Sequence, residues 1–245
     1  MKRLAMIGVL LAVLGVGTVA MSAFGAANVV WLCKEKVIVG ASERCLVVSE
    51  NEGAVRLEDM KADSAVECAS GSLIGEGWVG PGSEAEATSG SFVQPKTNCK
   101  PSARALNAKE EEATNVCEVV EAAEPLNLPW DGLLELVGGV VEGQGKPGSS
   151  GKQPGYLLTC KTALGTIDDT CSTVAGKEPD GKILNLPGNA TEPPLVTGEA
   201  TESIPSGLTG TCTVGGVESA LVVGSGLLAA LTAAGVLESL EVGEP

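Results

Sequence analysis

Short apolar runs separated by clusters of glycine, proline, serine and threonine make up most of this chain. Helical periodicity is weak almost throughout, whereas strand-like runs bounded by turn residues recur. The pattern predicts an all-β protein of short strands. The predicted strands are 29–39, 44–49, 54–58, 65–69, 91–94, 116–122, 156–163, 167–171, 182–186, 195–200, 208–214 and 217–223. Residues 104–113 and 227–240 are the segments that could form short helices instead.

The stretch most typical of a linker is "EGQGKPGSSGKQPG" at 142–155, which is rich in glycine and holds no large apolar residue. It separates an N-terminal β-rich region, 28–141, from a C-terminal one, 156–245. The alternative is a long loop within one domain. For the fold we expect a disulfide-braced antiparallel β-sandwich, Ig-like or double-sheet, with two β subdomains as a variant.

The N-terminus has the pattern of a secretory signal peptide. Lys2 and Arg3 precede an uncharged apolar stretch, and small residues follow, with cleavage expected after Gly25 or Ala27. The sequence therefore predicts a signal peptide at 1–27 and a secreted protein, extracellular or associated with the cell envelope. An uncleaved N-terminal anchor is the alternative.

Charge narrows the range of partners. The chain has a formal net charge of −15, and the predicted signal peptide contains only cations, so the mature protein is more acidic still. Nucleic acids and anionic membranes require a basic surface, which argues against both. The uncharged stretch 219–237 is long enough to span a membrane. Its glycines and the acidic residues that follow argue against a span, so none is predicted after cleavage.

All eight cysteines lie beyond the predicted signal peptide, and an even number in an exported chain predicts four disulfides. A hairpin that turns at Gly165-Thr166 would place Cys160 opposite Cys171, which is the pair predicted first. The other pairs follow less directly, from bracketing, proximity in sequence and elimination. They are Cys99–Cys117, Cys33–Cys45, for which a simple hairpin geometry is unfavourable, and Cys68–Cys212.

The chain has no histidine, which removes the usual catalytic triads and most zinc sites. No catalytic residue, metal or cofactor is predicted. Asp168 and Asp169 are adjacent on a predicted strand and so point to opposite faces. "SSGK" at 149–152 matches a serine–lysine motif, but it lies in the most flexible-looking segment. The expected protein is a non-enzymatic structural or interaction protein with an unidentified extracellular or cell-surface partner. A carboxylate-dependent hydrolase assembled by the fold is the third hypothesis.

Aromatic residues are scarce, which draws attention to Trp130 in "EPLNLPWDG" at 124–132. Its ring could stack on a sugar or another small ligand, or it could cap a strand end. The word Leu-Asn-Leu-Pro recurs at 184–187 without a tryptophan, which indicates a strand-ending device. Trp130 and Trp78 are the candidate ligand-binding residues, and a carbohydrate- or small-ligand-binding β-sandwich module is the alternative function.

Several words occur in one order along the chain. They are "VVWL", "VRLEDM" (55–60), "VECASGSLIGEGWVGPG" (66–82), "LNLPWDGLLEL" (126–136), "GYLLTCKTALGTIDDTC" (155–171) and "TCTVGG" (211–216). In these the chain resembles a group of uncharacterised exported proteins of high-GC actinobacteria. The resemblance implies secretion and a β fold, and it implies that Cys33 and Cys45 are a local addition. It implies no activity, ligand or site residue.

Overall fold

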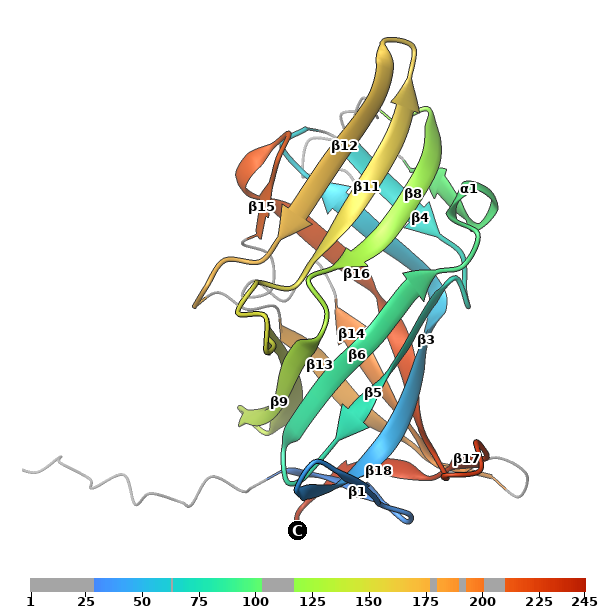
Figure 1. The fold of residues 1–245 in the computed structure, drawn as a ribbon, viewed down its shortest axis with the longest axis vertical. Helices are drawn as coiled ribbons and strands as arrows, with labels where there is room; N and C mark the ends of the chain where they lie inside the picture. Colours follow the sequence, from blue (N-terminus) through green and yellow to red (C-terminus); the bar gives the residue numbers. More distant parts are fainter. Residues whose placement is uncertain (1–28, 63, 103–116, 177–179, 190–192, 201–209) are drawn as a thin grey trace, which may run out of the picture.

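The computed structural model describes residues 29–62, 64–102, 117–176, 180–189, 193–200 and 210–245. Within these ranges nearly every element is a β-strand, which confirms the all-β prediction (Figure 1). The single helix there, α1 (Pro95–Asn98), has four residues. None of the helices in the described part is long and apolar enough to cross a membrane. The predicted signal peptide and the predicted helix at 104–113 lie outside the described residues.

Eight antiparallel strands form a closed barrel. Each pairs with the next, and the last pairs back with the first along almost its whole length. The barrel strands, in spatial order, are β3 (Ser42–Asp59), β5 (Leu73–Val79), β6 (Glu84–Phe92), β9 (Trp130–Val137), β10 (Val140–Pro147), β13 (Asp180–Leu186), β14 (Leu195–Ala200) and β16 (Gly216–Leu231).

The long strands β3 and β16, of 18 and 16 residues, continue above the barrel and carry a second group of strands. In Figure 1 this upper region has β8, β11 and β12 on one side and β3, β4 and β16 on the other. Its additional strands are β4 (Ser64–Cys68), β7 (Cys99–Pro101), β8 (Val119–Leu126), β11 (Gly155–Thr162), β12 (Gly165–Ser172) and β15 (Gly210–Cys212).

The closed barrel differs from the predicted sandwich. Strands β3 and β16 pair over register positions from Leu46 to Asp59, so the sheet curls back on itself instead of forming two separate layers. The segment that could have been helical, 227–240, instead completes β16 and supplies β17 (Leu237–Glu238). Residues 142–147 of the predicted linker belong to β10.

A two-stranded ribbon closes the lower end of the barrel (Figure 1). It consists of β1 (Val30–Cys33) and β18 (Leu240–Gly243), with the short strand β2 (Val37–Val39) following. The Asn185 side-chain amide donates to the Val242 carbonyl at 2.7 Å and accepts from the Val242 N–H at 2.8 Å. The Trp31 N–H donates to the Gly82 carbonyl at 3.0 Å. These bonds fix the ribbon to the barrel.

Two clusters of buried side chains hold this architecture together. The lower cluster fills the bottom of the barrel and contains Val29, Trp31, Cys45, Val47, Val79, Leu134, Val196, Ala230, Leu240 and Val242. The upper cluster fills the region above the barrel and contains Val55, Leu57, Val66, Cys68, Phe92, Cys99, Cys117, Val120, Ala123, Tyr156, Leu158, Cys160, Cys171, Cys212 and Ala220.

Four disulfides are present, and one predicted pair, Cys33–Cys45, is confirmed. The other three predicted pairs, Cys160–Cys171, Cys99–Cys117 and Cys68–Cys212, are wrong. The observed bridges are Cys68–Cys99, Cys117–Cys160 and Cys171–Cys212.

The register of one hairpin explains the first error. Strands β11 and β12 turn two residues earlier than predicted, with Thr162 opposite Gly165, so Cys160 faces Ile167 and not Cys171. Cys171 is instead the direct partner of Cys212 on β15, at a Cα–Cα distance of 4.0 Å. The observed bridges thus join neighbouring strands that are far apart in sequence, which elimination along the chain could not find.

Candidate ligand cavity

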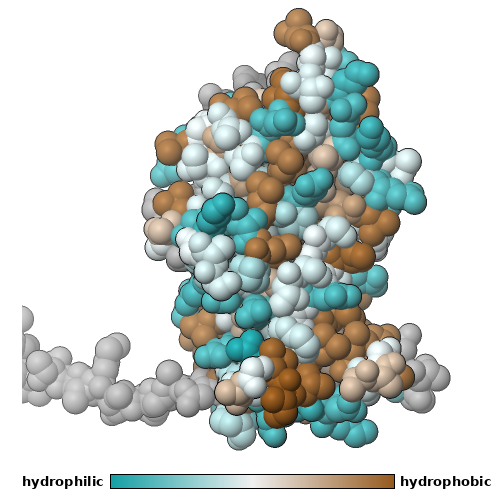
Figure 2. All heavy atoms as spheres, viewed as in Figure 1, coloured by the Kyte–Doolittle hydropathy of each residue, from teal (hydrophilic) through white to brown (hydrophobic). Residues whose placement is uncertain are grey.

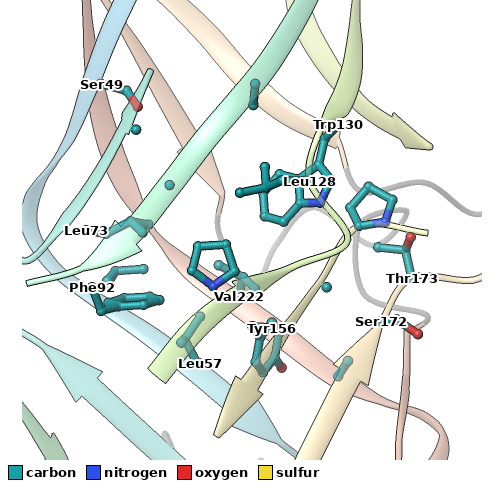
Figure 3. A pocket seen from close by; sticks show the side chains of 18 of the residues that line it. Ser49, Leu57, Leu73, Phe92, Leu128, Trp130, Tyr156, Ser172, Thr173 and Val222 are labelled. Atoms are coloured by element: carbon teal, nitrogen blue, oxygen red, sulfur yellow. The ribbon is translucent and has the colours of Figure 1, made fainter. Parts of the chain in front are cut away.

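An apolar cavity of about 340 Å³ lies where the barrel meets the upper cluster (Figure 3). Its walls come from both regions: β3, β5, β6, β9 and β16 contribute from the barrel, and β8, β11 and β12 from above. Three aromatic residues take part, namely Phe92, Trp130 and Tyr156. A volume of this size lies within the range of ligand pockets in proteins, about 300–1,000 Å³.

Trp130 is the first residue of β9, and its half-buried ring faces into the cavity (Figure 3). The turn before it positions the ring. Asn127 adopts a left-handed conformation with φ of 65°, and its side chain donates to the Gln153 carbonyl at 2.8 Å. The chain therefore folds back, and the Trp130 indole N–H donates to the Leu126 carbonyl at 2.6 Å. Trp130 is thus both the strand-end residue and the ligand-facing ring that the sequence offered as alternatives.

Tyr156 lies on β11 below the upper cluster, with its ring against the cavity (Figure 3). Its hydroxyl donates to the Glu58 carbonyl at 2.5 Å and accepts from the Leu221 N–H at 3.2 Å. Burial raises the pKa of Tyr156 far above its ordinary value, so the phenol stays neutral. Both bonds connect β11 to the β3–β16 pair, which makes Tyr156 a fixed part of the cavity roof.

The chemistry of the lining is nearly uniform. Among the described residues that line the cavity none is charged, and the polar members are hydroxyl residues. Tyr156 is engaged as above, and the Thr173 hydroxyl donates to the Gln153 side-chain carbonyl at 2.9 Å. The remaining wall is aliphatic, including Leu57, Leu73 and Leu128. An uncharged, weakly polar interior favours an uncharged, apolar occupant.

Glycine creates the space. Gly75, Gly90, Gly181 and Gly210 all line the cavity, where a larger residue would fill it. At Gly90 an added Cβ would lie 3.3 Å from Pro125 Cγ and 3.8 Å from Leu128 Cδ1, both of which line the same cavity. The hollow therefore results from small residues at inward-facing positions of strands that elsewhere carry large ones.

The other two tryptophans lie elsewhere. Trp31 is buried in the lower cluster. Trp78 is half-buried on β5, between Gly77 and Val79, whose buried positions mark the inner face, so its ring lies on the outer face of the barrel wall. The two candidate ligand residues Trp78 and Trp130 are therefore on opposite faces, and the structure does not bring them together. Tyr156 and Phe92, which complete the aromatic wall, carried no signal in the sequence beyond their rarity.

A pair of buried carboxyl groups lies in the upper region, apart from the cavity lining. Asp59 and Asp169 are both buried, whereas Asp168 on the opposite face is exposed, as the alternation of the strand predicts. Asp59 accepts from the N–H groups of Gly215, Lys61 and Ala62 at 2.6–3.2 Å.

Asp169 has a different environment. One of its oxygens, Oδ1, accepts from the Thr213 hydroxyl at 2.9 Å and the Val214 N–H at 3.1 Å, while Oδ2 is buried without a partner of its own. Burial raises the pKa of Asp169, and the neighbouring Asp59 raises it further, although the Val214 N–H opposes the shift. The pair holds the turn between β15 and β16.

The remaining motifs do not form a site. The Asp169 carboxylate lies near Cys171 and Cys212, but these two sulfurs are bonded to each other and cannot ligate a metal. Lys152 of the serine–lysine motif is exposed in the connection between β10 and β11, and its N–H donates to the Ser150 hydroxyl at 3.2 Å. Comparison with known proteins adds no relative, because no family model, curated protein or solved structure matches the chain.

Proposed function

We propose that this is an exported binding protein that holds an uncharged, apolar small molecule inside its barrel. The observation that carries the proposal is the cavity of about 340 Å³ whose described lining holds no charged side chain. Soluble proteins pack their interiors densely and rarely leave voids of this size. A preformed apolar hollow with a few polar groups is the usual form of a small-molecule site.

The geometry favours an apolar ligand over a sugar. A sugar needs many hydrogen-bond partners around its hydroxyl groups, and stacking on a ring alone would leave them unpaired. In this cavity the polar atoms of Trp130 and Tyr156 are already bonded to backbone groups. Both rings therefore offer the ligand their apolar faces.

The carboxylate-dependent hydrolase has less support. The acidic pair that the fold assembles, Asp59 and Asp169, is absent from the cavity lining, and it accepts hydrogen bonds from the backbone of one turn. These two groups stabilise a loop, and a substrate in the cavity would not touch them.

Export is supported by the covalent structure. Four disulfides join all eight cysteines, and none is free. Disulfides persist in oxidising compartments outside the cytosol. Together with the signal-peptide pattern of residues 1–27, they favour a carrier or scavenger of apolar molecules that works outside the cell or at its envelope.

An interaction protein with an extracellular partner is the second candidate. It is favoured by apolar surface at the lower end of the molecule, where hydrophobic side chains gather around β1 and β18 (Figure 2). Ile38, Val236 and Leu237 are each more than half exposed. Large exposed apolar patches mark interaction sites in many soluble proteins.

Binding of N-phenyl-1-naphthylamine, an uncharged dye that fluoresces in apolar surroundings, tests the proposed function. We expect saturable binding to the mature, oxidised protein. Ala87→Leu should weaken it about tenfold, because Ala87 lines the cavity and the added groups occupy it. Thr88→Leu is the matched control, since Thr88 is exposed on the same strand.

Equal loss of binding in both variants, with both still folded by circular dichroism, would place the dye outside the cavity. Failure of the wild-type protein to bind this dye and simple alkanols would contradict the proposed function.

A further inference from the structure

The hydroxyl of Ser49 differs from the other polar groups around the cavity. Ser49 follows Cys45 and Val47 at alternate positions of β3, and those two residues are buried inside the barrel. Alternation therefore directs Ser49 inward, where it lines the cavity. Its direct partner on the neighbouring strand is Gly75.

Gly75 leaves the room that this hydroxyl uses. A Cβ at Gly75 would lie only 2.7 Å from Ser49 Oγ, so an alanine there would press on the oxygen. In Figure 3 Ser49 lies on the far side of the cavity from Ser172 and Thr173, with Leu73 between it and Phe92. The hydroxyl is thus one polar point at one end of an apolar space.

Within the described part of the chain, Ser49 Oγ forms no hydrogen bond. The other hydroxyls of known partner, those of Tyr156 and Thr173, are bonded to protein groups. Polar groups inside proteins are nearly always paired, because an unpaired hydroxyl in apolar surroundings loses its hydrogen bonds to water. An unpaired hydroxyl that faces a ligand cavity is therefore free to pair with the ligand.

We infer that the ligand carries one neutral oxygen, an alcohol or a ketone, at one end of an apolar body, and that Ser49 recognises this oxygen. The inference rests on the proposed function and narrows it to a chemical class. A carboxylate at the same point would be buried without a counter-charge, because no charged residue lines the described wall. A space of about 340 Å³ holds on the order of ten water-sized groups, which suits a ligand of about ten to twenty non-hydrogen atoms.

Three ligands that share one ring system test the inference: naphthalene, 1-naphthol and 1-naphthoate. Each is titrated against the complex with N-phenyl-1-naphthylamine, and displacement gives its affinity. The wild-type protein should prefer 1-naphthol to naphthalene by about three- to tenfold, the contribution of one net hydrogen bond. It should bind 1-naphthoate more weakly than either.

Two variants assign the hydrogen bond. Ser49→Ala should abolish the preference for 1-naphthol while leaving the affinity for naphthalene unchanged. Ser172→Ala is the matched control, because Ser172 is a hydroxyl residue at the other end of the same cavity. This variant should keep the preference.

The outcomes separate the two claims. A preference that survives in Ser49→Ala, or that is lost in Ser172→Ala, would overturn the assignment to Ser49. Binding of 1-naphthoate as tightly as 1-naphthol would overturn the neutral class of ligand. Either result would leave the proposed function standing, because the dye would still bind in the cavity. Only the absence of dye binding in the wild-type protein would remove both.

Discussion

The lower and upper clusters of this protein are built from different materials. The lower cluster packs large side chains such as Trp31, Leu134 and Leu240 inside the closed barrel. The upper cluster contains six cysteines in three disulfides, and the buried pair Asp59 and Asp169 lies beside it. Between the two lies the cavity, with its glycine-rich wall.

The comparison shows that the topology of the barrel does not decide whether its interior is filled. The same strands run through the lower cluster and past the cavity. On β5, Val79 contributes to the packed end, whereas Gly75 lines the hollow. On β9, Leu134 is buried in the packed end and Trp130 borders the hollow. The size of the inward-facing residue at each level determines where the barrel is solid.

Covalent bracing gives the largest difference between the two regions. Replacing Cys171 and Cys212 by alanine removes a bridge that spans 41 residues and should lower the free energy of unfolding by about 4 kcal/mol. Replacing Cys33 and Cys45 removes one that spans 12 residues and should cost about 3 kcal/mol. Urea denaturation of the two double variants measures both. A larger loss at the lower bridge would show that the upper region does not depend on its disulfides.

Packing gives the next difference. Leu240→Ala opens a cavity in the lower cluster, where Leu240 is fully buried, and should lower the free energy of unfolding by about 3 kcal/mol. Leu128→Ala only enlarges an existing hollow beside a half-buried side chain and should cost about 1 kcal/mol. Equal losses in urea denaturation would mean that the cavity is as densely packed as the lower cluster.

The smallest effect concerns the buried acids of the upper region. The raised pKa of Asp169 means that the folded protein holds this proton more tightly than the unfolded chain. Its contribution to stability is therefore greatest at low pH and declines as the pH rises from about 3.9, the unfolded value, through the folded pKa.

Asp169→Asn should remove this decline, because an amide can donate to Asp59 without carrying a charge. Relative to wild type, the variant should gain about 1 kcal/mol on going from pH 4 to pH 8. Asp168→Asn, on the exposed face of the same strand, should change little. The measurement is the urea midpoint of each protein across that pH range. A wild-type profile parallel to that of Asp169→Asn would contradict the shared proton.

Strands whose inner positions are apolar could be predicted from the sequence. The β11 and β12 hairpin and strands β4 and β14 lie close to the predicted ranges. Strands β5, β9 and β10 were missed, and all three carry glycine at inward-facing positions, as at Gly75, Gly132 and Gly143. Without alternating hydrophobic side chains, a strand gives no periodic signal.

The candidate site follows the same division. Trp130 was identifiable because a tryptophan in a chain poor in aromatics is conspicuous. Ser49 and Gly75 were not, because a serine and a glycine become a binding point only when two strands place them side by side. Asp59 and Asp169 are 110 positions apart in the numbering, and nothing local relates them.

The sequence by itself determined the class of structure, the acidic charge and the dependence on disulfides, because alternation, composition and the cysteine count are local or additive properties. Only the tertiary structure decided the closure of the barrel, three of the four disulfide partners and the position of the hollow. Each of these depends on the register between distant strands, and a shift of two residues in one hairpin was enough to change a cysteine's partner.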